Sequence, residues 1–114
     1  MHITIHSRGF ILTKALRSYV EQRLRVALGW SGSRLRMLAV SLSDINGPRG
    51  GIDKRCKIQV QLRGGKSVVI EDTEADLYAA IDRAAERADR ALVRQVGRQR
   101  GFAHERFAID DDEQ

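Results

Sequence analysis

Residues 74–98 hold two kinds of side chain that recur at helical spacing. When successive residues are placed about 100° apart, small and apolar residues gather on one side of the segment. They are Leu77, Ile81, Ala84, Ala85, Ala88, Leu92 and Val96. The segment is therefore expected to form one long helix, capped by Thr73, whose apolar side packs against the rest of the protein. Such a helix requires a second layer to cover that side.

The remaining sequence predicts this second layer. Alternating polar and apolar residues indicate four short strands, whose expected ranges are 2–6, 35–44, 55–63 and 67–71. Another helix is expected over 14–28, after the N-cap Thr13. Short turns, including Gly64-Gly65, should join the last three strands as an antiparallel meander, whereas the helix between the first two strands makes that pair parallel. The predicted fold is α+β in the order β-α-β-β-β-α: a four-stranded mixed sheet with both helices packed on one face.

Five arginines form a row on the side of residues 74–98 opposite the apolar residues, within an arc of about 80°. The arginine row consists of Arg83, Arg87, Arg90, Arg94 and Arg98. Guanidinium groups in line repel one another unless an anion lies along them, and arginine matches phosphate well. The acids Asp82, Glu86 and Asp89 lie on one flank and leave most of the row uncompensated, although Glu86 and Arg90 have the spacing of a salt bridge. The row therefore favours nucleic-acid binding, with an ordinary solvated helix face as the alternative.

The charge balance agrees with an anionic partner. The chain of 114 residues has a formal charge of +5 and a pI near 10.0. Four acids lie at 110–113, so residues 1–109 carry +5 plus 4, or +9. A membrane surface would also satisfy this charge, but no segment is apolar enough to span a bilayer and no signal peptide opens the chain, so a cytoplasmic protein that does not bind membranes is expected.

One domain is expected over 1–100, followed by a flexible acidic tail over 101–114, because the residues after Gly101 lack a periodic pattern. The residues that carry enzyme chemistry are not arranged for it. His2, His6 and His104 have no metal-ligand spacing with Cys56, and Cys56 lies at an inward strand position, which is typical of a small core residue. No phosphate-binding loop or nucleophile elbow is present. No catalytic residue, metal, cofactor or small-molecule substrate is therefore expected.

Two segments resemble a known family. Residues 76–92, DLYAAIDRAAERADRAL, resemble the second helix of the ribosome hibernation factors, the group of hibernation-promoting factors and ribosome-associated inhibitors. Residues 13–24, TKALRSYVEQRL, resemble the first helix of that family. The expected strand order also matches the family fold, which is similar to a double-stranded-RNA-binding domain, and the resemblance covers residues 2–98.

The resemblance implies binding to the small ribosomal subunit and its rRNA, in the cleft between head and body. A protein there would block the sites of messenger RNA and transfer RNA in starved or stationary-phase cells. Carried over residue by residue, the resemblance implies RNA contacts from Arg17 and Arg23 and from Arg83, Arg87, Arg90 and Arg94; the row itself adds Arg98. Long members carry a second domain that pairs ribosomes, and this chain ends before one, so a monomer of the short form is expected.

Arg23 has two interpretations that the sequence leaves open. By helical position it lies at the edge of the apolar stripe of residues 14–28, and a buried arginine without a partner is costly. The side chain is expected either to pair with Asp76 or Asp82, or to reach RNA from the groove between the helices. Two alternative functions for the whole chain also stay open: a protein-interaction module that meets acidic partners, and a double-stranded-RNA regulator that acts off the ribosome.

Overall fold

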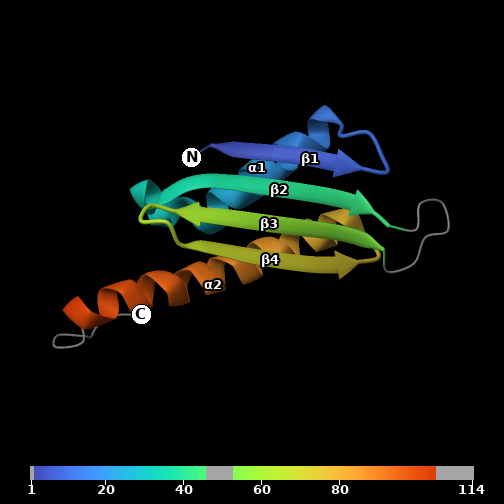
Figure 1. The fold of residues 1–114 in the computed structure, drawn as a ribbon. Helices are drawn as coiled ribbons and strands as arrows, with labels where there is room; N and C mark the ends of the chain where they lie inside the picture. The colour runs from blue at the N-terminus through green and yellow to red at the C-terminus, as the bar shows by residue number, and fades with distance from the viewer. Residues whose placement is uncertain (1, 46–52, 105–114) are drawn as a thin grey trace.

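The computed structural model describes residues 2–45 and 53–104, with the backbone alone for 98–104. Along the chain the elements are β1 (Ile3–Arg8), α1 (Lys14–Leu28), the 3-10 helix η1 (Gly29–Arg34), β2 (Leu35–Asp44), β3 (Lys54–Leu62), β4 (Ser67–Glu74) and α2 (Leu77–His104). Figure 1 shows the sheet in front of the two helices. The predicted α+β order β-α-β-β-β-α is confirmed, and η1 is an addition that the sequence did not indicate.

The four strands form one mixed sheet in the order β1-β2-β3-β4. β1 pairs with β2 in parallel, through contacts such as Ile5 opposite Val40, while β2–β3 and β3–β4 are antiparallel. Gly64 and Gly65 make the turn between β3 and β4 with φ angles of +96° and +93°, which an L side chain rarely adopts. The predicted mixed sheet is therefore confirmed, with β1 and β4 as its two edges.

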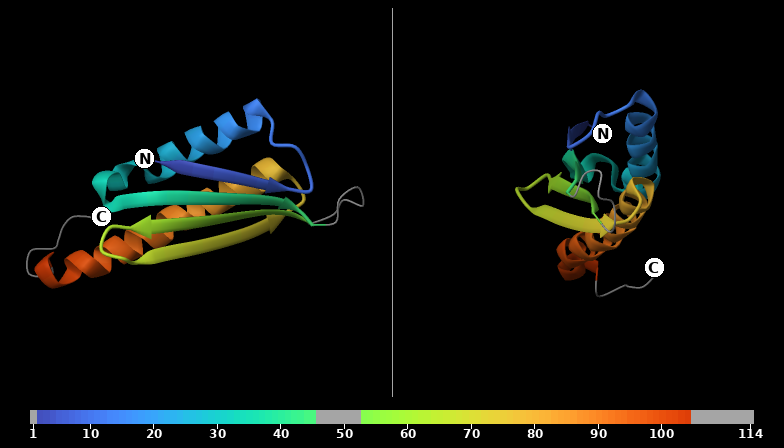
Figure 2. Two further views of the ribbon diagram at one scale, coloured as in Figure 1. Left: turned by 45° about the horizontal axis from the view of Figure 1, so that its top comes forward. Right: turned by 90° about the vertical axis from the view of Figure 1, so that its right-hand side faces the viewer.

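Both helices cover the same face of the sheet (Figure 2). Every second residue of the inner strands points toward them, and the largest fully buried side chains come from all layers: Leu24, Leu28, Leu38, Leu42, Ile58, Ile81 and Leu92. The other face carries mainly polar residues such as Ser41 and Lys57, which are partly or fully exposed, together with the exposed Val69. The protein therefore has two layers with one core between them.

The two helices begin at different kinds of cap. The N–H of Leu16 donates to Oγ1 of Thr13 at 3.1 Å, so the predicted start of α1 is confirmed. The predicted cap Thr73 of α2 is wrong, because β4 continues to Glu74 and Thr73 pairs with Arg55 in the sheet. The N–H of Ala79 instead donates to Oδ2 of Asp76 at 3.1 Å. Threonine is favoured in strands and aspartate is an equally good cap. Thr73 therefore belongs to the sheet, and Asp76 caps the helix.

The predicted end of the second helix near residue 98 is also wrong. α2 passes through Gly97 and Gly101 and continues to His104. An interior glycine costs a helix only about 1 kcal/mol, and the buried Val96 holds the turn before Gly97 against the core. Residues 105–114, with the four acids of the predicted tail, lie outside the described residues. No helix in the described part of the chain is both long enough and apolar enough to cross a membrane.

Candidate nucleic-acid interface

The apolar side of α2 lies where its spacing predicts. Six of the seven small and apolar residues are buried, namely Ile81, Ala84, Ala85, Ala88, Leu92 and Val96, and Leu77 packs against the core at its edge. These three alanines and Ala80 are all fully buried, and their small side chains let the helix approach the sheet closely. The arginine row therefore faces away from the core, and its members Arg83, Arg87, Arg90 and Arg94 are exposed. The side chain of Arg98 lies outside the described residues.

The first two arginines of the row are held by the edge strand β4. Nε of Arg83 lies 3.6 Å from Oε2 of Glu74. Nη1 of Arg87 donates to the backbone oxygen of Glu71 at 2.6 Å and to Oδ1 of Asp72 at 3.4 Å. A hydrogen bond with Asp72 raises the pKa of Glu74, since the two carboxyl groups lie close together. The two guanidinium groups therefore compensate an acidic pair at the end of β4.

The next two arginines have no such partner. Within residues 2–45 and 53–97, no carboxylate lies within ion-pair distance of Arg90 or Arg94. The reason is geometric: four helical residues rise about 6 Å, which is close to the rise of two strand residues. The strand positions level with Arg90 and Arg94 fall in Ser67–Ile70, which holds no acid. Among the described residues, Arg90 and Arg94 are thus the cations of the row without an ion-pair partner.

One of the two sequence predictions for the acids of α2 is wrong. Asp82, Glu86 and Asp89 leave the arginine row uncompensated as predicted, but acids of β4, which the sequence did not indicate as partners, pair with Arg83 and Arg87. The predicted salt bridge between Glu86 and Arg90 is absent, since the nearest cation to Glu86 is Nη2 of Arg23 at 4.0 Å. The acids Asp82, Glu86 and Asp89 face the other helix instead of the arginine row.

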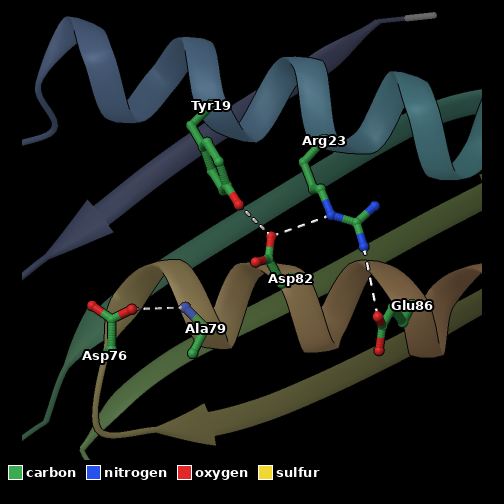
Figure 3. A network of polar contacts seen from close by, with 6 residues as sticks. All are labelled: Tyr19, Arg23, Asp76, Ala79, Asp82 and Glu86. Atoms are coloured by element: carbon green, nitrogen blue, oxygen red, sulfur yellow. Dashed lines mark hydrogen bonds and ion pairs between the residues drawn. The ribbon is translucent and has the colours of Figure 1, made fainter.

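Arg23 points from α1 into the junction between the two helices (Figure 3). Its Nε donates to Oδ1 of Asp82 at 3.2 Å, and the hydroxyl of Tyr19 donates to the same oxygen at 2.5 Å. The structural ion pair, one of the two interpretations of Arg23, is therefore confirmed with Asp82 as the partner. Asp76, the other candidate, caps α2 instead. An additional contact of Arg23 with RNA stays a prediction.

Arg17 lies apart from the other predicted contacts. It is exposed, and it precedes Arg23 by six residues, or about 240° of net rotation around the helix. Because Arg23 faces α2, Arg17 lies on another side of α1. The structure thus separates the predicted set into Arg23 between the helices, Arg83 and Arg87 at the β4 edge, Arg90 and Arg94 free, and Arg17 on its own.

Sequence reasoning missed the full row of contacts along the helix junction. Nε1 of Trp30 donates to Oδ1 of Asp89 at 2.7 Å, and the Tyr19 and Tyr78 rings meet edge to face with centroids 4.8 Å apart. A signal was available in the sequence. Residues 19, 23, 26 and 30 recur at the same helical spacing as the acids of α2. The sequence therefore contained two faces of matching spacing, but it did not indicate that these two faces are in contact.

The hydrogen bond between Tyr19 and Asp82 gives a prediction about stability. Replacing Tyr19→Phe is expected to lower the free energy of unfolding by about 1 kcal/mol, measured by urea denaturation at pH 7. The matched control is Tyr78→Phe, because the Tyr78 hydroxyl has no hydrogen bond to another described residue. Equal losses in the two variants would contradict the assigned role of the Tyr19 hydroxyl.

The same contact predicts a pH dependence. The hydrogen bond to Asp82, then burial, raises the pKa of Tyr19 above its ordinary value of 10.0. A raised pKa favours the neutral hydroxyl in the folded protein, so its stabilisation is fully present below pH 10 and is lost as the pH rises through the folded pKa. The stability difference between the native chain and Tyr19→Phe is therefore expected to shrink above about pH 10.

Cys56 and the possible metal ligands are the residues on which the sequence prediction about enzyme chemistry depends. Cys56 is buried as predicted, and burial raises the pKa of its thiol to about 12, which keeps it protonated at neutral pH. No group of three or more histidine, cysteine or acidic side chains among the described residues is placed to hold a metal ion. The chemistry that the geometry offers is the binding of anions at exposed arginines.

Comparisons with known proteins agree on one family. The family model described as sigma 54 modulation protein / S30EA ribosomal protein matches residues 3–100. The N-terminal domain of Protein Y from Thermus thermophilus is 38% identical, with a TM-score of 0.70 over 83% of this chain and 99% of that chain. A ribosomal subunit interface protein from Coxiella burnetii is 18% identical, with a TM-score of 0.74 over 85% of this chain and 99% of that chain, and shows the shared fold. A comparison with curated proteins found no match.

Proposed function

Because this chain belongs to the sigma 54 modulation protein / S30EA ribosomal protein family, we propose that it is a ribosome hibernation factor. In this proposal it binds the small ribosomal subunit through rRNA and reduces translation in cells that are not growing. It acts as a monomer in the cytoplasm, by occupying the sites of messenger RNA and transfer RNA rather than by catalysis, and needs no cofactor.

The observation that carries this proposal is that Arg90 and Arg94 are exposed and have no ion-pair partner among the described residues, on a helix whose opposite side is buried from Ala80 to Val96. A rigid helix holds the Cα atoms of the two arginines about 6 Å apart along its axis, on the same side of the helix. Arginine donors of this kind bind phosphate oxygens in pairs. A phosphate chain along α2 would remove the repulsion between the arginines, which no described acid does.

The remaining predicted contacts have secondary parts in this proposal. Arg83 and Arg87 keep exposed surface beyond their ion pairs, so they add positive potential near the phosphates. Arg23 lies in the helix junction and Arg17 on another side of α1, so each would meet a different part of the rRNA. Arg98 would extend the row toward the end of α2.

Sedimentation with purified ribosomal subunits tests the proposal. The protein is expected to co-sediment with small subunits at low salt, to dissociate as the salt concentration rises, and to reduce translation in a cell extract at micromolar concentration. Large subunits serve as the control for general attraction to rRNA. Protein that stays free of small subunits and leaves translation unchanged would contradict the proposal.

The alternative functions predict different results when short RNA duplexes compete in this assay or when nuclease is added to it. A double-stranded-RNA regulator would bind short duplexes as tightly as it binds subunits. A module that meets acidic proteins would keep its partner after nuclease treatment. Either result would replace the ribosome as the proposed partner.

A further inference from the structure

Trp30 is a large aromatic residue that the core does not use. It is the one tryptophan of the chain and is 46% exposed. Its Nε1 donates to Oδ1 of Asp89 at 2.7 Å, across the junction between the two helices. The polar edge of the indole is thereby fixed to α2 while a large part of the ring faces solvent.

The backbone that carries Trp30 is held on both sides. Leu28 is fully buried just before it, and Oγ of Ser31 donates to the backbone oxygen of Leu28 at 2.6 Å. Nε of Arg63, from the turn after β3, donates to the backbone oxygen of Ser33 at 2.6 Å. The ring therefore has a fixed position before any partner arrives, which lowers the entropic cost of binding.

Two exposed valines occupy positions near Trp30 and its partner Asp89. Val26, on α1, precedes Trp30 of η1 by four residues and is 72% exposed, and Val93 lies one turn after Asp89 on α2 and is 52% exposed. A Cβ added at the adjacent Gly29 would meet nothing within 4 Å outside its chain neighbours, so the backbone before Trp30 borders open space. We call Val26, Trp30 and Val93 the junction patch.

The surroundings of the junction patch identify its occupant. Around the axis of α2, Val93 lies between Asp89, the partner of Trp30, and the arginines Arg90 and Arg94, which have no ion-pair partner among the described residues. The indole is fixed to Asp89, which directly precedes Arg90 on α2, and an aromatic ring near arginines matches a nucleotide, whose base stacks while its phosphate pairs with arginine. The three side chains are too few for a stable protein interface, which needs about 800 Å² on each partner. The base must be unpaired and turned out, because a duplex keeps its bases stacked inside.

We propose that Trp30 is a stacking site for an unpaired RNA base whose neighbouring phosphates bind Arg90 and Arg94. This inference rests on the proposed function and extends it, because it names a single-stranded feature of the rRNA as what the site recognises. Arginines alone bind duplex and single strand alike, whereas the indole adds a preference for an exposed base.

The native fluorescence of the chain reports this site directly, since Trp30 is its one tryptophan. A 12-nucleotide single-stranded RNA is expected to quench the emission as it binds, and a 12-base-pair duplex is expected to bind without comparable quenching. Equal quenching by the duplex, or binding of the single strand without any quenching, would overturn the proposal.

A pair of variants separates stacking from the contact with Asp89. Trp30→Leu and Trp30→Phe both lose the hydrogen bond to Asp89, but phenylalanine retains an aromatic ring. Trp30→Leu is expected to weaken binding of the labelled single strand and of small subunits by about ten-fold or more, with an unchanged salt slope, and Trp30→Phe is expected to recover much of that loss. Ile11→Ala, at another exposed apolar residue, is the control. Thermal unfolding of each variant verifies the fold.

The possible results for the stacking site and for the proposed function can be told apart. Trp30→Leu that binds small subunits as the native chain does, while reversal of Arg90 and Arg94 abolishes binding, would overturn the stacking site and leave the proposed function intact. Failure of the native chain to bind small subunits would instead overturn the proposed function. If Trp30→Leu weakens binding to intact subunits but not to protein-free RNA, the junction patch contacts a ribosomal protein, and this result would overturn the stacking site.

Discussion

The double substitution Arg90→Glu plus Arg94→Glu is expected to weaken association with small ribosomal subunits by about a hundred-fold or more. Each lost bond between guanidinium and phosphate is worth roughly 1.5–3 kcal/mol, and each new carboxylate repels the same phosphates. The dependence of the logarithm of affinity on the logarithm of salt concentration should become shallower by about two units, one for each phosphate contact. Co-sedimentation over a series of salt concentrations measures both quantities.

A control with the same change in net charge separates local contacts from general attraction. Arg8 lies in β1, at the edge of the sheet opposite β4, and Arg25 is exposed on α1. The double substitution Arg8→Glu plus Arg25→Glu is expected to have a much smaller effect. Equal losses in both pairs would mean that net charge, not the arginine row, determines binding. An unchanged salt slope in the Arg90 and Arg94 pair would mean that these side chains do not contact phosphate.

The substitution Leu24→Ala is expected to lower the free energy of unfolding by about 3 kcal/mol. Leu24 is 0% exposed in the centre of α1, between the sheet and α2, so its removal leaves a cavity that the surrounding layers fill only in part. For a domain of about 100 residues, the melting temperature should fall by roughly 10–20 °C. Urea and thermal denaturation measure the two effects.

The control for this loss is Val26→Ala on the same helix, because Val26 is largely exposed. It should change the free energy of unfolding by less than about 0.5 kcal/mol. Below its melting temperature, Leu24→Ala should still bind small subunits, since Arg90 and Arg94 keep their positions on α2. If the folded variant loses binding, the buried side of α1 contributes to binding, a role that the structure does not assign to it.

The helix junction shows how far the sequence alone could reach. The edge position of Arg23 and the cost of burying it predicted an acidic partner, and the two candidates included the right one. The choice of Asp82 over Asp76 depended on how α1 and α2 lie against each other, which places Tyr19 and Arg23 on the same oxygen. Asp76 caps α2 instead, because Thr73 is part of β4 and pairs with Arg55 in the sheet.

The local pattern of the chain determined its elements, their order and the buried side of each helix. These properties follow from spacing along the chain, at two residues for a strand and 3.6 for a helix, so neighbours in sequence are enough to define them. The sequence likewise determined that α2 carries arginines on its outer side.

Only the tertiary structure decided which of those arginines are free. Arg83 and Arg87 meet Glu74, Asp72 and the backbone of Glu71 because β4 runs beside the first turns of α2, and no spacing within the helix contains that information. Trp30 meets Asp89 across 59 residues of chain for the same reason. Electrostatic and hydrogen-bonding contacts act over a few ångströms of space, so the packing of the layers, not the order of residues, sets the charge left for a partner.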